Sequence, residues 1–120
     1  MVLVDTSIWI DHFKKGNSSL EKLLIDMEVL CHPFIIGELA CGNLNNRKEI
    51  LSLLHSLPKA TVLEHDEILY FIERRKLMGI GIGLIDVHLL ASAHFAHAPL
   101  WTLDKKLFNA SDALGISYTN

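Results

Sequence analysis

Short, continuous apolar runs alternate along this chain with longer segments in which apolar residues recur every three or four positions. The continuous runs predict buried strands, and they lie at residues 2–4, 29–31, 60–63 and 100–103, with a weaker run at 116–118. The segments between them have the periodicity of amphipathic helices. Strands that are apolar throughout need cover on both faces, and parallel strands need crossover helices. The pattern therefore predicts an α/β fold with a central, mostly parallel sheet.

Capping and chain-breaking residues place the helix boundaries. The first expected helix covers residues 8–15, is capped by Thr6 or Ser7 and ends at Gly16, and the second is opened by Ser18 and Glu21, which have capping-box spacing. The third runs from Pro33 to Gly42 and contains Glu38, and the fourth covers residues 50–57. The fifth covers residues 67–78 and is capped by Asp66, the sixth covers residues 84–96, and a short last helix follows Asp104. The glycines between residues 79 and 83 predict a loop.

Length and composition limit the organisation of the protein. The chain has 120 residues, of which 50% are hydrophobic, which suits one domain over residues 1–120. A net charge of −3 excludes a globally basic surface for nucleic acid, although local clusters of Lys and Arg can still contact phosphates. Cys31 and Cys41 are too few for a disulfide framework and are expected to be small core residues. We expect no signal peptide or membrane span, and a cytoplasmic location.

Four isolated carboxylates lie where strands end or helices run: Asp5, Glu38, Asp86 and Asp104. Asp5 and Asp104 each follow an apolar strand directly, and sites in open α/β sheets form beyond the carboxyl ends of the strands. Two unit charges about 4 Å apart repel by roughly 4 kcal/mol at an effective dielectric constant of about 20. If the four acids converge, they need a cation, and ligands that are all oxygen favour Mg²⁺ or Mn²⁺ over zinc. Such a site can activate water to hydrolyse a phosphodiester.

The same acids also have a purely structural interpretation. Asp5 and Asp104 can cap helices, and Asp86 suits a helix N-terminus. No single acid decides between the two interpretations, whereas the set of four favours the metal site.

Four ordered segments resemble those of PIN-domain proteins, specifically the VapC-type toxin ribonucleases of bacterial toxin–antitoxin pairs. They are VLVDTSIWID at residues 2–11, IGELA at 36–40, GLIDVHLLA at 83–91 and LWTLDKKL at 100–107. The resemblance covers essentially the whole chain. His88 and Leu107 differ from residues that are frequent in similar proteins, but neither replaces a proposed ligand.

The resemblance implies a PIN-like three-layer sandwich with helices on both faces of the sheet. It implies that the acidic quartet Asp5, Glu38, Asp86 and Asp104 is catalytic and binds Mg²⁺ or Mn²⁺ for endonucleolytic cleavage of RNA, with Asp104 acting through hydrogen bonds if it is not a direct ligand. We expect hydrogen bonds to these acids, or to water at the metal, from Thr6, Ser7 and Thr102. The implied partners are an RNA substrate, a cognate antitoxin that covers the acids, and commonly a second copy of the toxin, with no membrane.

Two other functions fit part of the pattern. A receiver-like signalling module also gathers acids around Mg²⁺ at a phosphorylated Asp, but this chain lacks a paired-acid motif after its first strand and a Lys at a strand end. The other possibility is a PIN-like protein without catalysis that acts only through its antitoxin.

Two kinds of surface are further candidates for binding. The basic runs Lys14-Lys15, Arg74-Arg75-Lys76 and Lys105-Lys106 can engage RNA phosphates, although solvated helix faces are the default interpretation. An antitoxin groove or dimer surface is predicted on an apolar face made of Ile8, Trp9, Phe13, Leu20 and Leu24.

Overall fold

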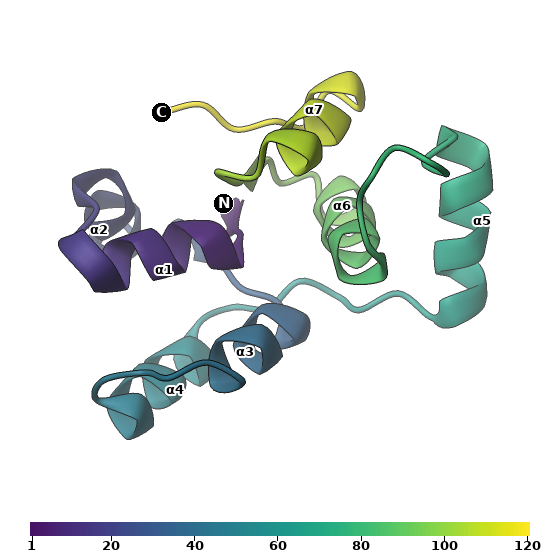
Figure 1. Cartoon of the computed structure of the whole chain (residues 1–120). Coiled ribbons are helices and arrows are strands. Elements are labelled where there is room, and N and C mark those ends of the chain that lie inside the picture. The colour runs from purple at the N-terminus through teal and green to yellow at the C-terminus, as the bar shows by residue number, and fades with distance from the viewer.

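Three parallel strands lie at the centre of the computed structural model, which describes residues 1–120. The strand order is β2-β1-β3, with β1 (Val2–Val4) between β2 (Val29–Leu30) and β3 (Leu100–Trp101). The helices are α1 (Thr6–Lys15), α2 (Ser18–Ile25), α3 (Pro33–Ala40), α4 (Arg47–Ser56), α5 (His65–Arg75), α6 (Leu84–Ala96) and α7 (Lys105–Ala113). Figure 1 shows these helices grouped around the short N-terminal strand. The predicted α/β fold with a parallel sheet is confirmed.

Helix α6 is buried along most of its length. All seven residues from Val87 to Ala93 are buried, which explains why its sequence is apolar on every side and lacks a clear polar face. The helix packs into the same core as β1 and β3, whose residues Leu3, Val4 and Leu100 are fully inaccessible to solvent. Burying a large apolar side chain contributes roughly 1.5–3 kcal/mol, so this core holds the start of α6 close to the sheet. None of the helices is both long and apolar enough to span a membrane.

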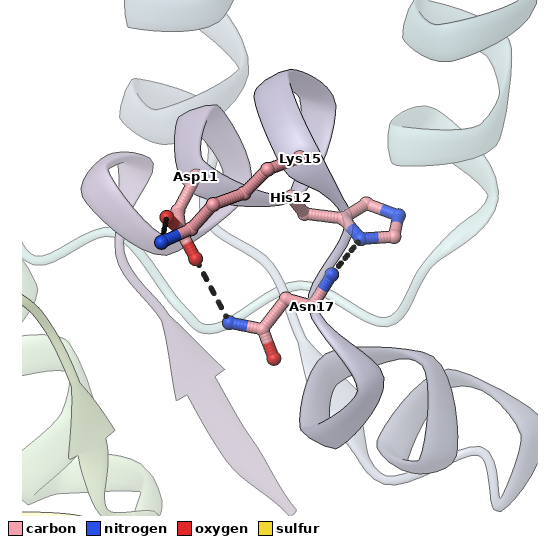
Figure 2. A network of polar contacts seen from close by, with 4 residues as sticks. All are labelled: Asp11, His12, Lys15 and Asn17. Carbon is pink, nitrogen blue, oxygen red and sulfur yellow. Dashed lines mark hydrogen bonds and ion pairs between the residues drawn. The ribbon is translucent and has the colours of Figure 1, made fainter.

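The junction between α1 and α2 is fixed by Asn17. Its backbone N–H donates to His12 Nδ1 at 3.1 Å, and its side-chain Nδ2 donates to Asp11 Oδ2 at 3.3 Å, as Figure 2 shows. The side-chain oxygen of Asn17 accepts from Leu20 N at 3.0 Å and so caps α2. The prediction that Ser18 caps this helix was wrong, because the amide of Asn17 serves both helices at once, which a hydroxyl one residue later does not.

Helix α5 begins and ends earlier than the sequence predicts. It starts at His65, and the Glu67 side chain accepts from Glu64 N at 3.0 Å, so Asp66 lies inside the first turn instead of capping it. Lys76 ends the helix in the left-handed conformation with φ of 55°, three residues before the first glycine of the following loop. The helix end is therefore set by a lysine that adopts an uncommon backbone conformation.

Two predicted strands are reduced to single bridges. Residues 60–63 leave the sheet after an isolated bridge between Cys31 and Lys59, and the Thr61 carbonyl accepts a side-chain hydrogen bond from Ser92 instead of pairing with a strand. At the other edge, Ser117 makes one bridge to Leu100. The sheet therefore has three strands, because both edge segments turn away after one pairing.

The apolar face predicted as a docking surface is part of the core. Ile8, Trp9 and Leu20 are fully buried, and Phe13 and Leu24 are partly buried against them. That prediction was therefore wrong: the side chains pack α1 and α2 against the sheet.

The two cysteines differ in their surroundings. Cys31 is buried as expected, whereas Cys41 is exposed just beyond the end of α3. The prediction that both cysteines are core residues was therefore wrong for Cys41.

A buried hydrogen-bond chain ties the start of α3 to the middle of α6. His32 is fully buried; its Nδ1 accepts from Phe34 N at 3.0 Å, and its Nε2 lies 3.1 Å from Ser92 Oγ. Because Nδ1 accepts, Nε2 carries the proton and donates to Ser92, which donates to the Thr61 carbonyl at 2.8 Å. Burial, and secondarily the charge of His88, lower the pKa of His32 from 6.5 to about 4, so the imidazole is neutral in the folded protein.

We expect the stability that His32 contributes to decline as the pH falls. The folded pKa lies below the unfolded value, so the unfolded chain takes up the proton first and folding stability is lost between about pH 6.5 and about pH 4. The gap in unfolding free energy between wild type and His32→Gln should narrow by roughly 2 to 3 kcal/mol from pH 7 to pH 4, measured by urea denaturation. His55→Gln, on the exposed side of α4, is the control. A gap that stays constant would contradict the neutral, buried imidazole.

Candidate metal centre at the carboxyl edge of the sheet

The pairing of β1 with β3 places the residues that follow each strand side by side. Val4 is in register with Trp101, so Asp5 and Thr102 come next on adjacent parallel strands. Asp5 N donates to the Trp101 carbonyl at 2.9 Å, which continues the pairing to the edge of the sheet. Carboxyl ends of parallel strands are where ligands bind in such folds, and this is where two of the four predicted acids lie.

Asp5 is buried and held by two hydroxyl groups. Its Oδ2 accepts from Ser7 Oγ and from Thr102 Oγ1, each at 2.7 Å, and from Ser7 N at 3.4 Å. The contact from Ser7 N also caps α1, which corrects the expectation that Thr6 or Ser7 is the cap. The same carboxylate therefore begins a helix and faces the candidate site.

The two hydroxyl groups are themselves oriented by the backbone. Ser7 Oγ accepts from Leu103 N at 3.0 Å, and Thr102 Oγ1 accepts from Asp104 N at 3.0 Å. Each oxygen that accepts from an amide has its proton free to donate to Asp5, so the direction of both hydroxyl protons is fixed. This network links Asp5 to the segment that carries Asp104.

The other three acids are anchored by different elements. Glu38 extends from α3, and its Oε1 accepts from Thr6 Oγ1 at 2.7 Å. In the first turn of α6, Asp86 Oδ2 accepts from Gly83 N at 3.4 Å. Asp104 caps α7, and its Oδ1 accepts from Leu107 N at 3.0 Å. The two interpretations of the acids are therefore compatible, because Asp5 and Asp104 cap helices and also belong to a group of acids.

In all four carboxylates, one oxygen accepts hydrogen bonds and the other accepts none. The anchored atoms are Asp5 Oδ2, Glu38 Oε1, Asp86 Oδ2 and Asp104 Oδ1. Their charges act on one another: burial raises the pKa of Asp86, the hydrogen bond from Gly83 lowers it, and the charges of Asp5, Asp104 and Glu38 raise it further. The structure therefore brings the four predicted acids into one electrostatic group.

The donor set suits a hard divalent cation. Four carboxylates with one free oxygen each, and no nitrogen or sulfur donor among them, match the ligands of Mg²⁺ or Mn²⁺. The acids do not form a closed cage, since no three His, Cys, Asp or Glu side chains lie close enough together to hold an ion as they stand. Mg²⁺ usually keeps several waters and uses one or two carboxylates, so an open arrangement fits it.

Comparison with known proteins matches the model of the PIN domain family to residues 2–113. The chain belongs to the PIN domain family. It is 44% identical over 118 residues to Ribonuclease VapC32, found in two strains of Mycobacterium tuberculosis, with 98% of this chain and 95% of the relative covered.

Solved structures share the fold of this PIN domain at low sequence identity. A toxin–antitoxin complex from Klebsiella pneumoniae matches with a TM-score of 0.68 and 20% identity, covering 90% of both chains. FitAcB from Neisseria gonorrhoeae matches with a TM-score of 0.61 and 22% identity, covering 100% of this chain and 97% of the other. A crystal structure from Pyrobaculum aerophilum matches with a TM-score of 0.66 and 16% identity, covering 91% and 83%.

Sequence reasoning missed the backbone groups of this PIN domain's site. The amides of Gly83, Leu103 and Asp104 orient the acids and the hydroxyls, and no residue type in the sequence marks them. His88, which departs from the family pattern, is buried with its ring edge-on to Phe34 at 4.7 Å between centroids. Its ring therefore packs α6 against Phe34 of α3.

Removing one of the repelling charges should stabilise the metal-free protein. Asp86→Asn keeps an acceptor for Gly83 N, so in EDTA we expect the variant to unfold about 2 to 5 °C above wild type, a gain of about 1 kcal/mol. Addition of Mn²⁺ should then raise the unfolding temperature of wild type more than that of the variant. Thermal unfolding followed by circular dichroism measures both effects.

The matched control is Asp66→Asn, because Asp66 also lies in the first turn of a helix but on α5. It should show no rise in EDTA. An Asp86→Asn protein that melts below wild type in EDTA would contradict the proposed repulsion.

Proposed function

We propose that this PIN domain, acting as one unit over residues 1–120, is an endoribonuclease that depends on Mg²⁺ or Mn²⁺ and is the toxin of a toxin–antitoxin pair. One observation carries the proposal: four carboxylates from separate elements are each anchored through one oxygen with the other left without a hydrogen bond, and three of them act on the charge of the fourth, Asp86. The 44% identity to Ribonuclease VapC32 supports RNA as the substrate.

The proposed roles follow from how firmly each acid is held. Asp5 is buried and held by three donors to one oxygen, and Asp86 is half-buried, so these two hold the cation. Glu38 and Asp104 are exposed and complete the site from the solvent side. Thr6, Ser7 and Thr102 orient the carboxylates through their hydroxyl groups.

A divalent cation at this position would neutralise charge on the phosphate and make water a stronger nucleophile. Asp5 and Asp86 would hold that cation at the edge of the sheet, with Glu38 and Asp104 on the solvent side, and the core beneath Asp5 excludes water from the buried side. Hydrolysis in which water attacks phosphorus and the 3′ oxygen leaves gives products with 5′-phosphate and 3′-hydroxyl ends. A 2′,3′-cyclic phosphate would instead indicate attack by the ribose hydroxyl.

The proposed partners follow from the same charges. An antitoxin that places an arginine against the acids would offset the repulsion that a cation relieves. The resemblance to a toxin–antitoxin complex in fold agrees with such a partner. Self-association into a homodimer and a cytoplasmic location, where the RNA substrate is found, are part of the proposal.

Metal-dependent cleavage that requires Asp5 is the first test. Purified protein free of antitoxin should cut a panel of structured RNAs with Mg²⁺ or Mn²⁺ and not in EDTA, and Asp5→Asn should lower the rate at least roughly 100-fold because the most rigid ligand is lost. Asp66→Asn should cleave like wild type. Folded wild-type protein that cleaves no RNA above the Asp5→Asn background would favour a binding-only or receiver-like function.

Thr102 should act through Asp5 and not through the fold alone. Thr102→Val removes the proton donated to Asp5 and the acceptor of Asp104 N while preserving shape, and we expect roughly 10- to 100-fold weaker cleavage. More metal should also be needed for half-maximal rate. Thr102→Ser, which restores the hydroxyl, should recover most of the activity. Equal cleavage by the Val and Ser variants would show that the hydroxyl does not position Asp5.

A further inference from the structure

Two basic runs that lie 30 residues apart in the sequence meet at one pocket. Arg75 and Lys76, at the end of α5, and Lys106, in α7, line a hollow of about 370 Å³ together with Asn109. The other residues that line it are apolar, and no carboxylate lines it. In Figure 1, the segment joining α5 to α6 passes between α5 and the rest of the molecule at this end. No local pattern along the chain predicts that these runs lie together.

The cations around this pocket are not neutralised by the protein. The ion pairs of the structure join Met1 to Glu28 and Lys15 to Asp11, and neither involves the pocket. Arg75 is held in place by His94, whose Nε2 lies 3.2 Å from Nη2, while Lys76 and Lys106 make no hydrogen bond through their side chains. Three like charges around one hollow repel one another and favour a bound anion.

Lys106 occupies a costly position and is nevertheless packed in place. It lies in the first turn of α7, where the helix dipole disfavours a positive charge. Its side chain lies across Gly81, which has φ of 85°; a Cβ at Gly81 would come within 2.9 Å of both Cδ and Nζ of the lysine. The glycine therefore lets the loop pass directly beneath the lysine.

Two segments at this pocket lead along the chain directly to acids of the candidate site. Lys106 is two residues beyond Asp104, and the loop that carries Gly81 continues to Gly83, whose amide holds Asp86. A strand of RNA has a phosphate at every nucleotide. When one phosphate lies at the acids, its neighbours extend past this edge of the site, and contacts with them fix the register of the strand.

We propose that Arg75, Lys76 and Lys106 form a binding site for a backbone phosphate of RNA next to the linkage that is cleaved. The proposal rests on the nuclease function argued above. The site recognises the phosphate and not the base, because its polar groups are cationic or a single amide. It positions the RNA strand while the acids on the adjoining edge carry the chemistry.

The test measures binding in the absence of cleavage. Fluorescence anisotropy with single-stranded RNA in EDTA, over a series of salt concentrations, compares wild type with Lys76→Gln/Lys106→Gln. We expect roughly tenfold weaker binding and a slope of log K against log salt that is shallower by about 0.7, because one lost phosphate contact on a single strand removes about 0.7. Arg75 is left unchanged because it also contacts His94.

Two matched variants make the result specific. Lys22→Gln/Lys48→Gln removes the same charge from exposed positions on α2 and α4 and should keep the wild-type slope. Lys76→Arg/Lys106→Arg keeps the charge and should restore binding. If Lys76→Gln/Lys106→Gln and Lys22→Gln/Lys48→Gln bind RNA equally, the proposed site is wrong.

Cleavage assays on the same proteins separate this proposal from the nuclease function. Wild-type protein that cleaves RNA, with binding that does not depend on the two lysines, overturns the phosphate site and leaves the nuclease intact. Binding that depends on the lysines, without cleavage under Mg²⁺ or Mn²⁺, supports the phosphate site and overturns the nuclease.

Discussion

Repulsion among four carboxylates is the constraint on which the rest of this structure depends. Burial raises the pKa of Asp86, and the charges of Asp5, Asp104 and Glu38 raise it further. The protein holds them by giving one oxygen of each acid a hydrogen-bond donor, taken from a hydroxyl or a backbone amide. Such donors stabilise the charged form without neutralising it, so a net negative group remains at the edge of the sheet.

The hydrophobic core turns that local arrangement into a rigid one. Helix α6 is buried almost from its first turn, which fixes Asp86 relative to the sheet. The buried chain from His32 to Ser92 joins the start of α3, which carries Glu38, to the middle of α6. A fully satisfied polar network specifies one packing arrangement more strictly than apolar contacts alone. The buried His32–Ser92 hydrogen bond therefore helps to keep Glu38 and Asp86 in a fixed relative position.

The sequence predicted most of the fold, because apolar strands and helical periodicity are local signals. Asp5 and Asp104 could be paired in advance, since each follows a strand of the sheet. Other features depend on tertiary contacts, which no local pattern predicts. The apolar pattern of residues 60–63 predicts a strand, but the Thr61 carbonyl accepts a hydrogen bond from Ser92 on α6. The face predicted as a docking surface lies instead against the core, where Ile8 and Trp9 are fully buried and Phe13 and Leu24 are partly buried. The sequence also could not indicate which backbone amides orient the acids, because every residue except proline has an amide N–H.

The arrangement of charge explains how a protein with a net charge of −3 can approach a polyanion. The acids alone would repel a phosphate, and screening by salt weakens but does not reverse that repulsion at short range. A cation at the acids changes the sign there, while the three cations at the neighbouring pocket are already positive and unpaired. In the proposed nuclease, attraction of the RNA strand and activation of the reaction are thus assigned to different residues. The first depends on lysines and arginine that the fold brings together, and the second depends on metal binding.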